Sequence, residues 1–225
     1  MQTPTSARVA SGARAGPGSK TSERFAVVRS GAQFRTRSIK LPNVLSFQID
    51  GRRCLRLLEE ADAEELYRVV SANREYLAQW MPWAAGQTLE NTLEFIRSTR
   101  RLLADNQGFQ TAITDDGRIV GTLGFHRIDW ENRSTSIGYW IAESSQGHGI
   151  VTRAVHALAD HAFRIWELNR IEIRAGRENE RSRAIPARLG FQEEGVLRQA
   201  EHVGDRFVDH VVYAMLAEDW RMISH

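Results

Sequence analysis

The sequence predicts an α/β (α+β) domain, in which a mixed β-sheet is covered by helices. Segments with alternating apolar and polar residues, typical of strands, interleave with segments whose apolar residues recur every three or four positions, as in helices. The chain has 225 residues, enough for one domain and an appendage. Its longest apolar run, Val211–Ala217, is far shorter than the roughly 18 residues that span a bilayer, which excludes a transmembrane helix.

The first half of the domain is expected to hold two helices and three strands. Asp62, followed three residues later by Glu65, forms a candidate capping box for the first helix. Thr88 is a candidate N-cap for the second helix, which carries apolar residues on one face up to Leu103. The expected strands are residues 54–57, 109–114 and 119–128, the last two joined by the turn Asp115-Asp116-Gly117.

The second half predicts a β–loop–α–β unit followed by a further helix and two strands. A strand at 135–141 leads into the loop 143–149, then into a helix at 151–165 and a strand at 170–175. The next helix, 182–189, ends at Gly190, a residue type favoured just after a helix. Gly195 interrupts the following strand, and residues 207–216 form the last one.

Residues 1–44 differ from the rest of the chain in composition and charge. Residues 1–40 hold eight Lys and Arg against the single acid Glu23, a net charge of +7, whereas the remainder has a net charge of −5. Rich in Ser, Gly and Ala, this region cannot bury enough apolar surface to offset its backbone entropy. We expect a disordered basic tail at 1–44 and a folded domain at 45–225.

The tail itself leaves several interpretations open. Its Arg- and Ser-rich, acid-poor composition fits an organelle transit peptide, but we favour the simpler alternatives, an upstream start codon or a floppy arm. It lacks the apolar segment of a secretory signal, and we expect a cytoplasmic protein without a membrane partner. Nucleic-acid binding is not expected, because no aromatic residues interleave with the basic ones for stacking.

The glycine-containing loop Gln146-Gly147-His148-Gly149 is the most informative local feature. A strand that runs through such a loop into a helix presents backbone N–H groups at the positive end of the helix dipole, where phosphates bind. The loop has no Lys, which excludes a P-loop, and a dinucleotide fingerprint requires a third Gly where Thr152 stands. The pyrophosphate loop of acyl-CoA-dependent N-acyltransferases and a plain connecting loop remain.

A second motif decides between them. Gln146–Thr152 is followed by Asn179-Glu180-Arg181-Ser182-Arg183-Ala184-Ile185-Pro186-Ala187-Arg188-Leu189-Gly190-Phe191. Together these segments resemble the GNAT acetyltransferase superfamily, and within it the RimJ/RimL branch of ribosomal-protein N-terminal acetyltransferases. The resemblance extends from about Leu45 to Trp220. It implies the GNAT fold, a central mixed, mostly antiparallel, twisted sheet that splays at the acyl-CoA cleft, with helices on both faces.

The resemblance also implies acetyl-CoA as the co-substrate and assigns residues to it. Asn179 would hold a pantetheine amide, and the strand end at Trp140 and Ile141 would pair with pantetheine and present an N–H to the reacting carbonyl. The backbone amides of seven successive residues would cradle the pyrophosphate: Gln146, Gly147, His148, Gly149, Ile150, Val151 and Thr152. No metal is expected, since the histidines and the single cysteine lack metal-ligand spacing.

Catalytic roles follow from the same resemblance. The Tyr that serves as acid in many GNAT members would stand at Pro186, so the usual acid is absent. In the RimL branch the Ser of Asn-x-x-Ser is the proposed acid, here Ser182, whose alternative role is a helix N-cap. Glu201 matches the branch's candidate base, although a surface or salt-bridged Glu is the alternative, and His202 is a rival base.

The acceptor of the acetyl group stays open at this stage. Trp80 and Trp83 follow the first helix, where the family lines its acceptor groove, although core packing would also explain them. The leading hypothesis is direct transfer to a protein N-terminal α-amine of ribosomal-protein type. The alternatives are a small-molecule amine (polyamine, peptide or aminoglycoside-type antibiotic) and a non-catalytic acyl-CoA-binding module. The branch also suggests a homodimer.

Overall fold

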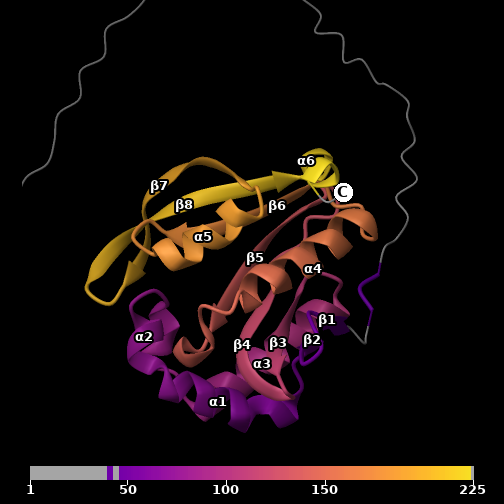
Figure 1. Cartoon of the computed structure of the whole chain (residues 1–225). Coiled ribbons are helices and arrows are strands. Elements are labelled where there is room, and N and C mark those ends of the chain that lie inside the picture. Colours follow the sequence, from indigo (N-terminus) through magenta and orange to yellow (C-terminus); the bar gives the residue numbers. More distant parts are fainter. Residues whose placement is uncertain (1–39, 43–45, 224–225) are drawn as a thin grey trace, which may run out of the picture. The chain divides into compact units, whose positions relative to one another are not determined.

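The computed structural model describes residues 40–42 and 46–223, and its centre is one eight-stranded sheet (Figure 1). The strand order is β1-β2-β3-β4-β5-β6-β8-β7. Every neighbouring pair is antiparallel except β5 and β6, which are parallel. The strands are β1 (Ser46–Gln48), β2 (Arg53–Leu57), β3 (Phe109–Asp115), β4 (Arg118–Phe125), β5 (Ser134–Ile141), β6 (Arg170–Gly176), β7 (Gln192–Val203) and β8 (Arg206–Leu216).

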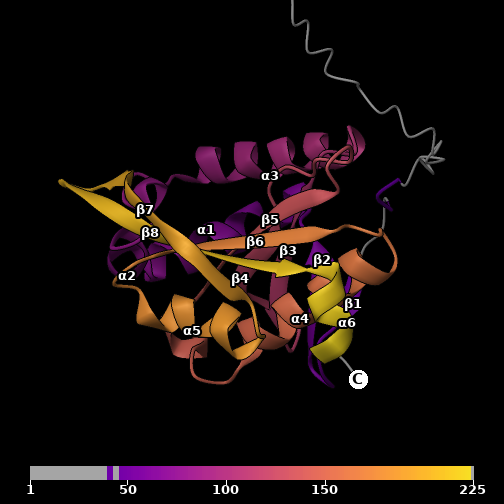
Figure 2. The same ribbon diagram turned by 90° about the horizontal axis from the view of Figure 1, so that it is seen from above.

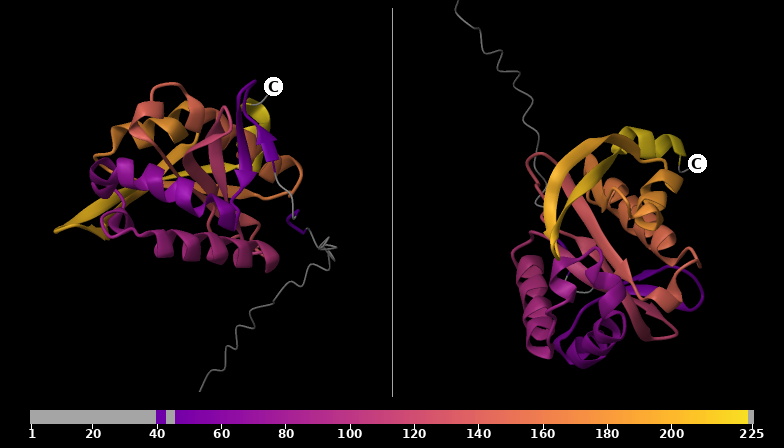
Figure 3. Two further views of the ribbon diagram at one scale, coloured as in Figure 1. Left: turned by 90° about the horizontal axis from the view of Figure 1, so that it is seen from below. Right: turned by 90° about the vertical axis from the view of Figure 1, so that its left-hand side faces the viewer.

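Helices cover both faces of the sheet, as Figures 2 and 3 show. The α4 side carries the larger apolar core, built on Leu158, Ile171 and Trp166, and the α1–α3 side a smaller one that includes Leu66 and Ile96. The helices are α1 (Ala63–Ala72), α2 (Arg74–Ala78), α3 (Leu89–Ala104), α4 (Ile150–Arg164), α5 (Glu180–Arg188) and α6 (Ala217–Ile223), with three short 3-10 turns at Glu60–Asp62, Pro82–Ala84 and Glu143–Ser145. None of the helices in the described part of the chain is long and apolar enough to cross a membrane.

The sheet splays between its two parallel strands, as expected. β5 and β6 pair only from Ser134↔Arg170 to Ser136↔Glu172, and then diverge (Figure 1). The N–H of Ala142, just after β5, donates to the carbonyl of Val120 on β4 (2.7 Å). Because backbone groups alternate in direction along a strand, the N–H and carbonyl groups of Tyr139 and Ile141 point into the gap. The expectation for the backbone of Trp140 is wrong, because Trp140 pairs with Thr122 and its N–H and carbonyl face β4, as those of Ala142 do.

Several local predictions are confirmed and others corrected. The Thr88 hydroxyl caps α3 by accepting from the N–H of Asn91 (3.1 Å), and Gly190 adopts a positive φ of 77° after α5. The Asp62–Glu65 capping box is wrong, because Asp62 binds Arg56 (2.7 Å) and the N–H of Glu59 (2.8 Å), while Glu65 accepts from Ile119 on β4. The expected strand 119–128 ends earlier, at Phe125, because the chain turns into the bridge between Asp129 and Ser134.

Most of the proposed tail, residues 1–39 and 43–44, lies outside the described residues. Of residues 40–42, Leu41 is buried against the core of the α4 side, and its N–H donates to Asn106 Oδ1 (2.8 Å). Packing against the domain thus already includes Leu41, upstream of the expected boundary at 44/45. Sequence alone did not reveal this contact, because a single Leu in a polar stretch carries no periodicity.

Candidate active site

The loop between β5 and α4 is built to leave backbone donors unpaired. Gly147 and Gly149 have positive φ angles of 79° and 66°, and Gly149 is the N-cap of α4 without a side-chain cap. Among the described residues, no backbone carbonyl accepts from the N–H groups of residues 147–149. The expectation that Gln146 supplies a backbone donor is wrong, because its N–H donates to the carbonyl of Glu143 (3.2 Å). The N–H groups of Ile150, Val151 and Thr152 begin the helix and have no acceptor one turn earlier. This concentration of donors fits an anionic ligand.

Two arginines that were not expected at the site, Arg153 and Arg181, reinforce this loop. Arg153 donates to the carbonyl of His148 (3.1 Å) and pairs with Asp50 (3.2 Å), which fixes the loop against the β1–β2 turn. Arg181 donates to the side chain of Gln146 (2.8 Å). The signal available in the sequence was an Arg near the start of each helix, the fourth residue of α4 and the second residue of α5, but only the fold brings the two helix starts together.

We call the space beside this loop the loop cavity, of about 830 Å³. Its charged lining residues are Glu143, Arg153, Arg181 and Arg188, a net positive set that complements phosphates. His148 is exposed and does not line it, whereas the other expected loop residues do. The remaining lining residues are Tyr76, Leu77, Trp80, Met81, Tyr139, Trp140, Ile141, Ser145, Gln146, Gly147, Gly149, Ile150, Val151, Thr152, Asn179, Ser182 and Ile185.

A second space, the hairpin cavity of about 910 Å³, reaches the opposite face and is bordered by the β7–β8 hairpin. The two cavities share six lining residues: Trp80, Met81, Tyr139, Trp140, Asn179 and Ser182. They therefore adjoin where β5 and β6 splay apart. The hairpin cavity is further lined by Leu66, Val70, Pro82, Trp83, Gln87, Asn91, Thr92, Phe95, Gln110, Thr122, His126, Ser136, Ile137, Gly138, Arg174, Ala175, Gly176, Ala200, Glu201 and His210.

Ser182 lies at this junction and is coupled to Tyr139. Pro186 stands inside α5 and has no N–H, so the carbonyl of Ser182, four residues earlier, lacks its helical donor. The Tyr139 hydroxyl donates to that carbonyl instead (3.0 Å), and Ser182 Oγ donates to the Tyr139 oxygen (3.3 Å). Burial raises the pKa of Tyr139, which keeps the phenol protonated.

Asn179, not Ser182, is the N-cap of α5. Its Oδ1 accepts from the N–H of Ser182 (3.1 Å), which places Ser182 at the third helical position. The alternative role of Ser182 as an N-cap is therefore wrong, because the helix begins two residues earlier than expected, at Glu180. The Asn179 side-chain amide still lines both cavities, where its donors can reach a ligand carbonyl.

Glu201 lines the hairpin cavity, and its Oε2 lies 3.1 Å from Nε2 of His210 on β8. His202 lines neither cavity, and its ring packs on Phe207 with centroids 4.9 Å apart. The structure thus places Glu201 at the hairpin cavity and the rival base His202 away from both cavities. His210 had no signal in the sequence, since it stands nine positions from Glu201.

Trp80 and Trp83 both border the hairpin cavity. Trp80 also lines the loop cavity, and the guanidinium of Arg206, from the β7–β8 hairpin, lies 5.7 Å from its ring centroid. Trp83 is 42% exposed and packs on Trp140, with ring centroids 6.2 Å apart. His126 is a further imidazole of this cavity, and desolvation together with the Arg174 guanidinium lowers its pKa.

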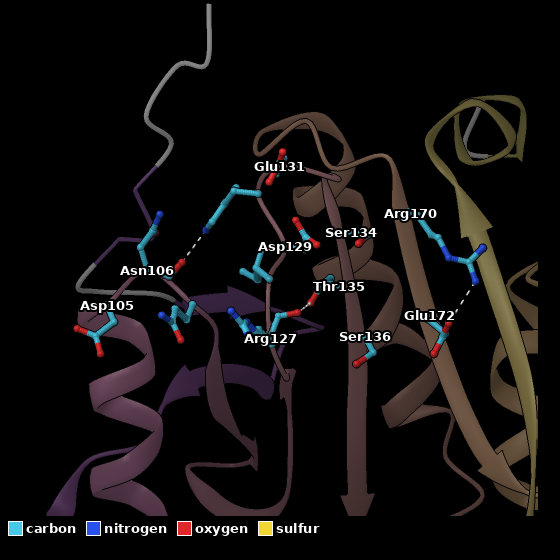
Figure 4. A pocket seen from close by; sticks show the side chains of 13 residues that line it. Asp105, Asn106, Arg127, Asp129, Glu131, Ser134, Thr135, Ser136, Arg170 and Glu172 are labelled. Atoms are coloured by element: carbon cyan, nitrogen blue, oxygen red, sulfur yellow. Dashed lines mark hydrogen bonds and ion pairs between the residues drawn. The ribbon is translucent and has the colours of Figure 1, made fainter. Parts of the chain in front are cut away.

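A third cavity, of about 770 Å³, opens at the start of β5 (Figure 4). Its lining includes Arg127, Asp129, Arg170 and Glu172, and Arg170 pairs with Glu172 (3.2 Å). It contains none of the residues expected to bind acetyl-CoA, to contact the acceptor or to act in catalysis. In the part of the chain that the structure describes, no three His, Cys, Asp or Glu side chains are grouped as metal ligands would be.

Comparison with known proteins agrees with this geometry. A family model described as an acetyltransferase (GNAT) domain matches residues 52–192. The Bacillus subtilis (strain 168) protein YdaF, assigned by its name to the ribosomal N-acetyltransferases, is 39% identical over 168 residues, which cover 74% of this chain and 92% of YdaF. A ribosomal-protein-serine acetyltransferase of Escherichia coli (strain K12) is 31% identical over 165 residues, covering 73% and 92%.

Among solved structures, RimL, a ribosomal L7/L12 α-N-protein acetyltransferase in complex with coenzyme A, superimposes with a TM-score of 0.75 at 27% identity. The match covers 78% of this chain and 99% of RimL. The expected fold is confirmed, and the chain belongs to the GNAT acetyltransferase family. It is an acetyl-CoA-dependent N-acetyltransferase of the RimJ/RimL kind.

Proposed function

We propose that this enzyme acetylates the α-amino group of a protein N-terminus, of the ribosomal-protein type that its relatives' names describe. The observation that supports this acceptor is the charge of the hairpin cavity. Glu201 is the one carboxylate among its described lining residues, and Arg174 is a cation in the same lining. A polyamine or aminoglycoside carries several ammonium groups and therefore favours a site with several carboxylates. A peptide N-terminus carries a single ammonium group, for which one carboxylate is enough.

Acetyl-CoA is the substrate on the other side of the sheet. Its pyrophosphate fits the loop cavity, where the N–H groups of residues 147–152 and the side chains of Arg153, Arg181 and Arg188 supply donors and positive charge. Asn179 and the free backbone edge of β5 then face the pantetheine amides. The thioester would lie at the junction, beside the N–H of Tyr139 or Ile141 that points into the gap.

The reaction then proceeds directly in the ternary complex. The amine nitrogen attacks the thioester carbonyl, Glu201 takes the proton released from nitrogen, and the strand N–H stabilises the oxyanion. When the C–S bond breaks, its electron pair stays on sulfur, and Ser182 Oγ protonates the thiolate. An α-amine with a pKa of about 7.7–8.0 places a smaller demand on a carboxylate base than a lysine near 10.4.

A panel of acceptors tests this proposal. We expect a peptide with a free N-terminus to release thiol from acetyl-CoA and gain one acetyl group by mass spectrometry, while the same peptide with a blocked α-amine and an internal Lys does not react. Replacing Glu201 by Gln is expected to lower kcat/KM at least about tenfold. A higher kcat/KM for spermidine or an aminoglycoside than for every peptide would instead support the small-molecule acceptor.

A further inference from the structure

The β7 strand contains an irregularity that sets the direction of Glu201. Leu197 pairs with His210, yet Glu201 pairs with Val208, so four positions along β7 correspond to two along β8. Gln199, within this bulge, has a positive φ of 52°, which is uncommon for a residue other than Gly. Bulges of this kind re-aim a side chain, and here Ala200 and Glu201 both line the hairpin cavity.

Two neighbouring residues of β8 hold this bulge. Asp209 Oδ1 accepts from the backbone N–H of Gln199 (2.8 Å), and the carbonyl of Asp209 accepts from the N–H of Arg177 (2.8 Å). His210, the next residue, points to the other face and meets the Glu201 carboxylate at 3.1 Å. The backbone of the bulge and the carboxylate at its end are thus fixed by adjacent residues of one strand.

The contact between His210 and Glu201 is asymmetric. The His210 side chain is 18% exposed and the Glu201 side chain 39%, so the imidazole is the better anchored partner. Only Oε2 of Glu201 meets His210, and among the described residues no other side chain or backbone group pairs with Oε1. One oxygen is therefore held and the other is left for a ligand in the hairpin cavity.

We propose that His210 is a positioning residue for the base Glu201. Its Nε2–H donates to Oε2, restricts the rotamers of a flexible carboxylate, and directs Oε1 at the attacking amine. The proton leaves the nitrogen for Oε1, and the N–H electron pair stays on nitrogen to complete the amide. This inference rests on the proposed function, in which Glu201 is the base.

Four variants of two residues test it: Glu201→Gln, His210→Ala, His210→Gln and the double variant Glu201→Gln/His210→Ala. We expect His210→Ala to lower kcat about tenfold with an unchanged KM for acetyl-CoA, as a misdirected catalytic group does. The side-chain amide of His210→Gln still donates to Oε2 and should restore kcat to within about threefold. The double variant should be no slower than Glu201→Gln, because His210 acts only through Glu201.

Controls separate positioning from folding. His202→Gln changes the exposed imidazole beside Glu201 that packs on Phe207, and should keep wild-type kcat. Thermal unfolding and acetyl-CoA binding by calorimetry report whether each variant folds. If His210→Ala does not fold, His210→Asn is used in its place. The Asn side chain is too short to reach Oε2 of Glu201, so the same loss of kcat is expected.

The possible failures are distinguishable. Wild-type kcat in His210→Ala, or a double variant that shows the full product of both losses, would overturn the role of His210 while Glu201 remains the base. Wild-type activity in Glu201→Gln would overturn the base in the proposed function, and with it this inference. Loss of kcat in His210→Gln equal to that in His210→Ala would show that the hydrogen bond to Oε2 is not what His210 supplies.

Discussion

At the scale of single residues, Pro186 changes the hydrogen-bond partner of the Ser182 carbonyl. Pro186 occupies the position where the family resemblance places the Tyr that acts as general acid. As a proline it also lacks the N–H that would donate to the Ser182 carbonyl. Tyr139 arrives from a different element, β5, and its hydroxyl takes that place (3.0 Å). The phenol consequently stands at the junction of the two cavities, in contact with the proposed acid Ser182.

Tyr139→Phe tests this coupling. Removing the hydroxyl leaves the Ser182 carbonyl without a donor, so the free energy of unfolding should fall by about 1–3 kcal/mol. Adding Pro186→Ala supplies the missing helical N–H and should recover part of that loss, whereas the same change in the wild-type background should recover nothing. Urea denaturation of the four proteins measures the cycle, and equal effects of Pro186→Ala in both backgrounds would contradict it.

At the scale of elements, the ends of helices carry the decisive contacts. The N-terminus of α1 is fixed by Asp62, whose carboxylate meets both terminal nitrogens of Arg56 (2.7 and 2.8 Å) and the N–H of Glu59. Burial raises the pKa of Asp62, but the hydrogen bonds from Arg56 and Glu59 outweigh it, so the pKa lies below its ordinary value. The ionised form therefore stabilises the fold.

Asp62→Asn should lower the free energy of unfolding by about 1–3 kcal/mol at pH 7. The folded-state pKa lies below the unfolded value of about 3.9, so the stabilisation is complete above that pH and is lost as the pH falls through the folded pKa. The difference between variant and wild type should accordingly shrink below pH 4 in denaturation curves. Glu64→Gln, which loosens an exposed pair with Arg68 (4.0 Å), should cost less than about 0.5 kcal/mol.

The loop that precedes α4 allows a second test at the scale of elements, through the backbone conformation of Gly147. Gly147 has a φ of 79°, which L residues adopt at a cost of about 1–2 kcal/mol, and it lines the loop cavity. Gly147→Ala should therefore raise the KM for acetyl-CoA about tenfold and leave the acceptor KM unchanged. Gly86→Ala is the matched control, since its added Cβ meets nothing within 4 Å and it lines neither cavity. A change in acceptor KM alone would contradict the assignment of this loop.

At the scale of the whole molecule, the site depends on the splay between β5 and β6. The α4 side provides the loop cavity, and the α1–α3 side, with the β7–β8 hairpin, borders the hairpin cavity. Arg206 ties the hairpin to the end of α2 through the carbonyl of Gln79 (3.3 Å) and pairs with Glu178 (3.1 Å). Arg206 thus joins the β7–β8 hairpin to the chain after α2 and to the chain before α5, beside the hairpin cavity.

Every described residue that lines the loop and hairpin cavities lies between Leu66 and His210. A protein lacking residues 1–39 should therefore keep its kcat and both KM values within about twofold. The truncation retains Leu41, which packs on the core. Steady-state kinetics of the two proteins at matched concentration provide the measurement, and a loss of activity in the truncated protein would place part of the site in the first 39 residues.

Local features of the fold were predictable wherever neighbouring residues decide them. The helices at 89–104 and 150–164, the β3–β4 hairpin and the cap at Thr88 follow from periodicity and turn chemistry, because these act within a few positions. The short strand β1 and helix α2 had too few residues for a periodic signal. The capping box at Asp62 failed because Arg56, on β2, competed successfully for the carboxylate.

The sequence by itself determined the family, the glycine-containing loop and the identity of Asn179, Ser182 and Glu201 as candidates, because each belongs to a contiguous motif. Only the tertiary structure decided which groups meet them. His210 reaches Glu201 through a bulge that shifts the β7–β8 register by two residues, and Tyr139 reaches Ser182 across the splay. Such contacts depend on strand register and on the separation of strands, and the spacing of residues along the chain determines neither.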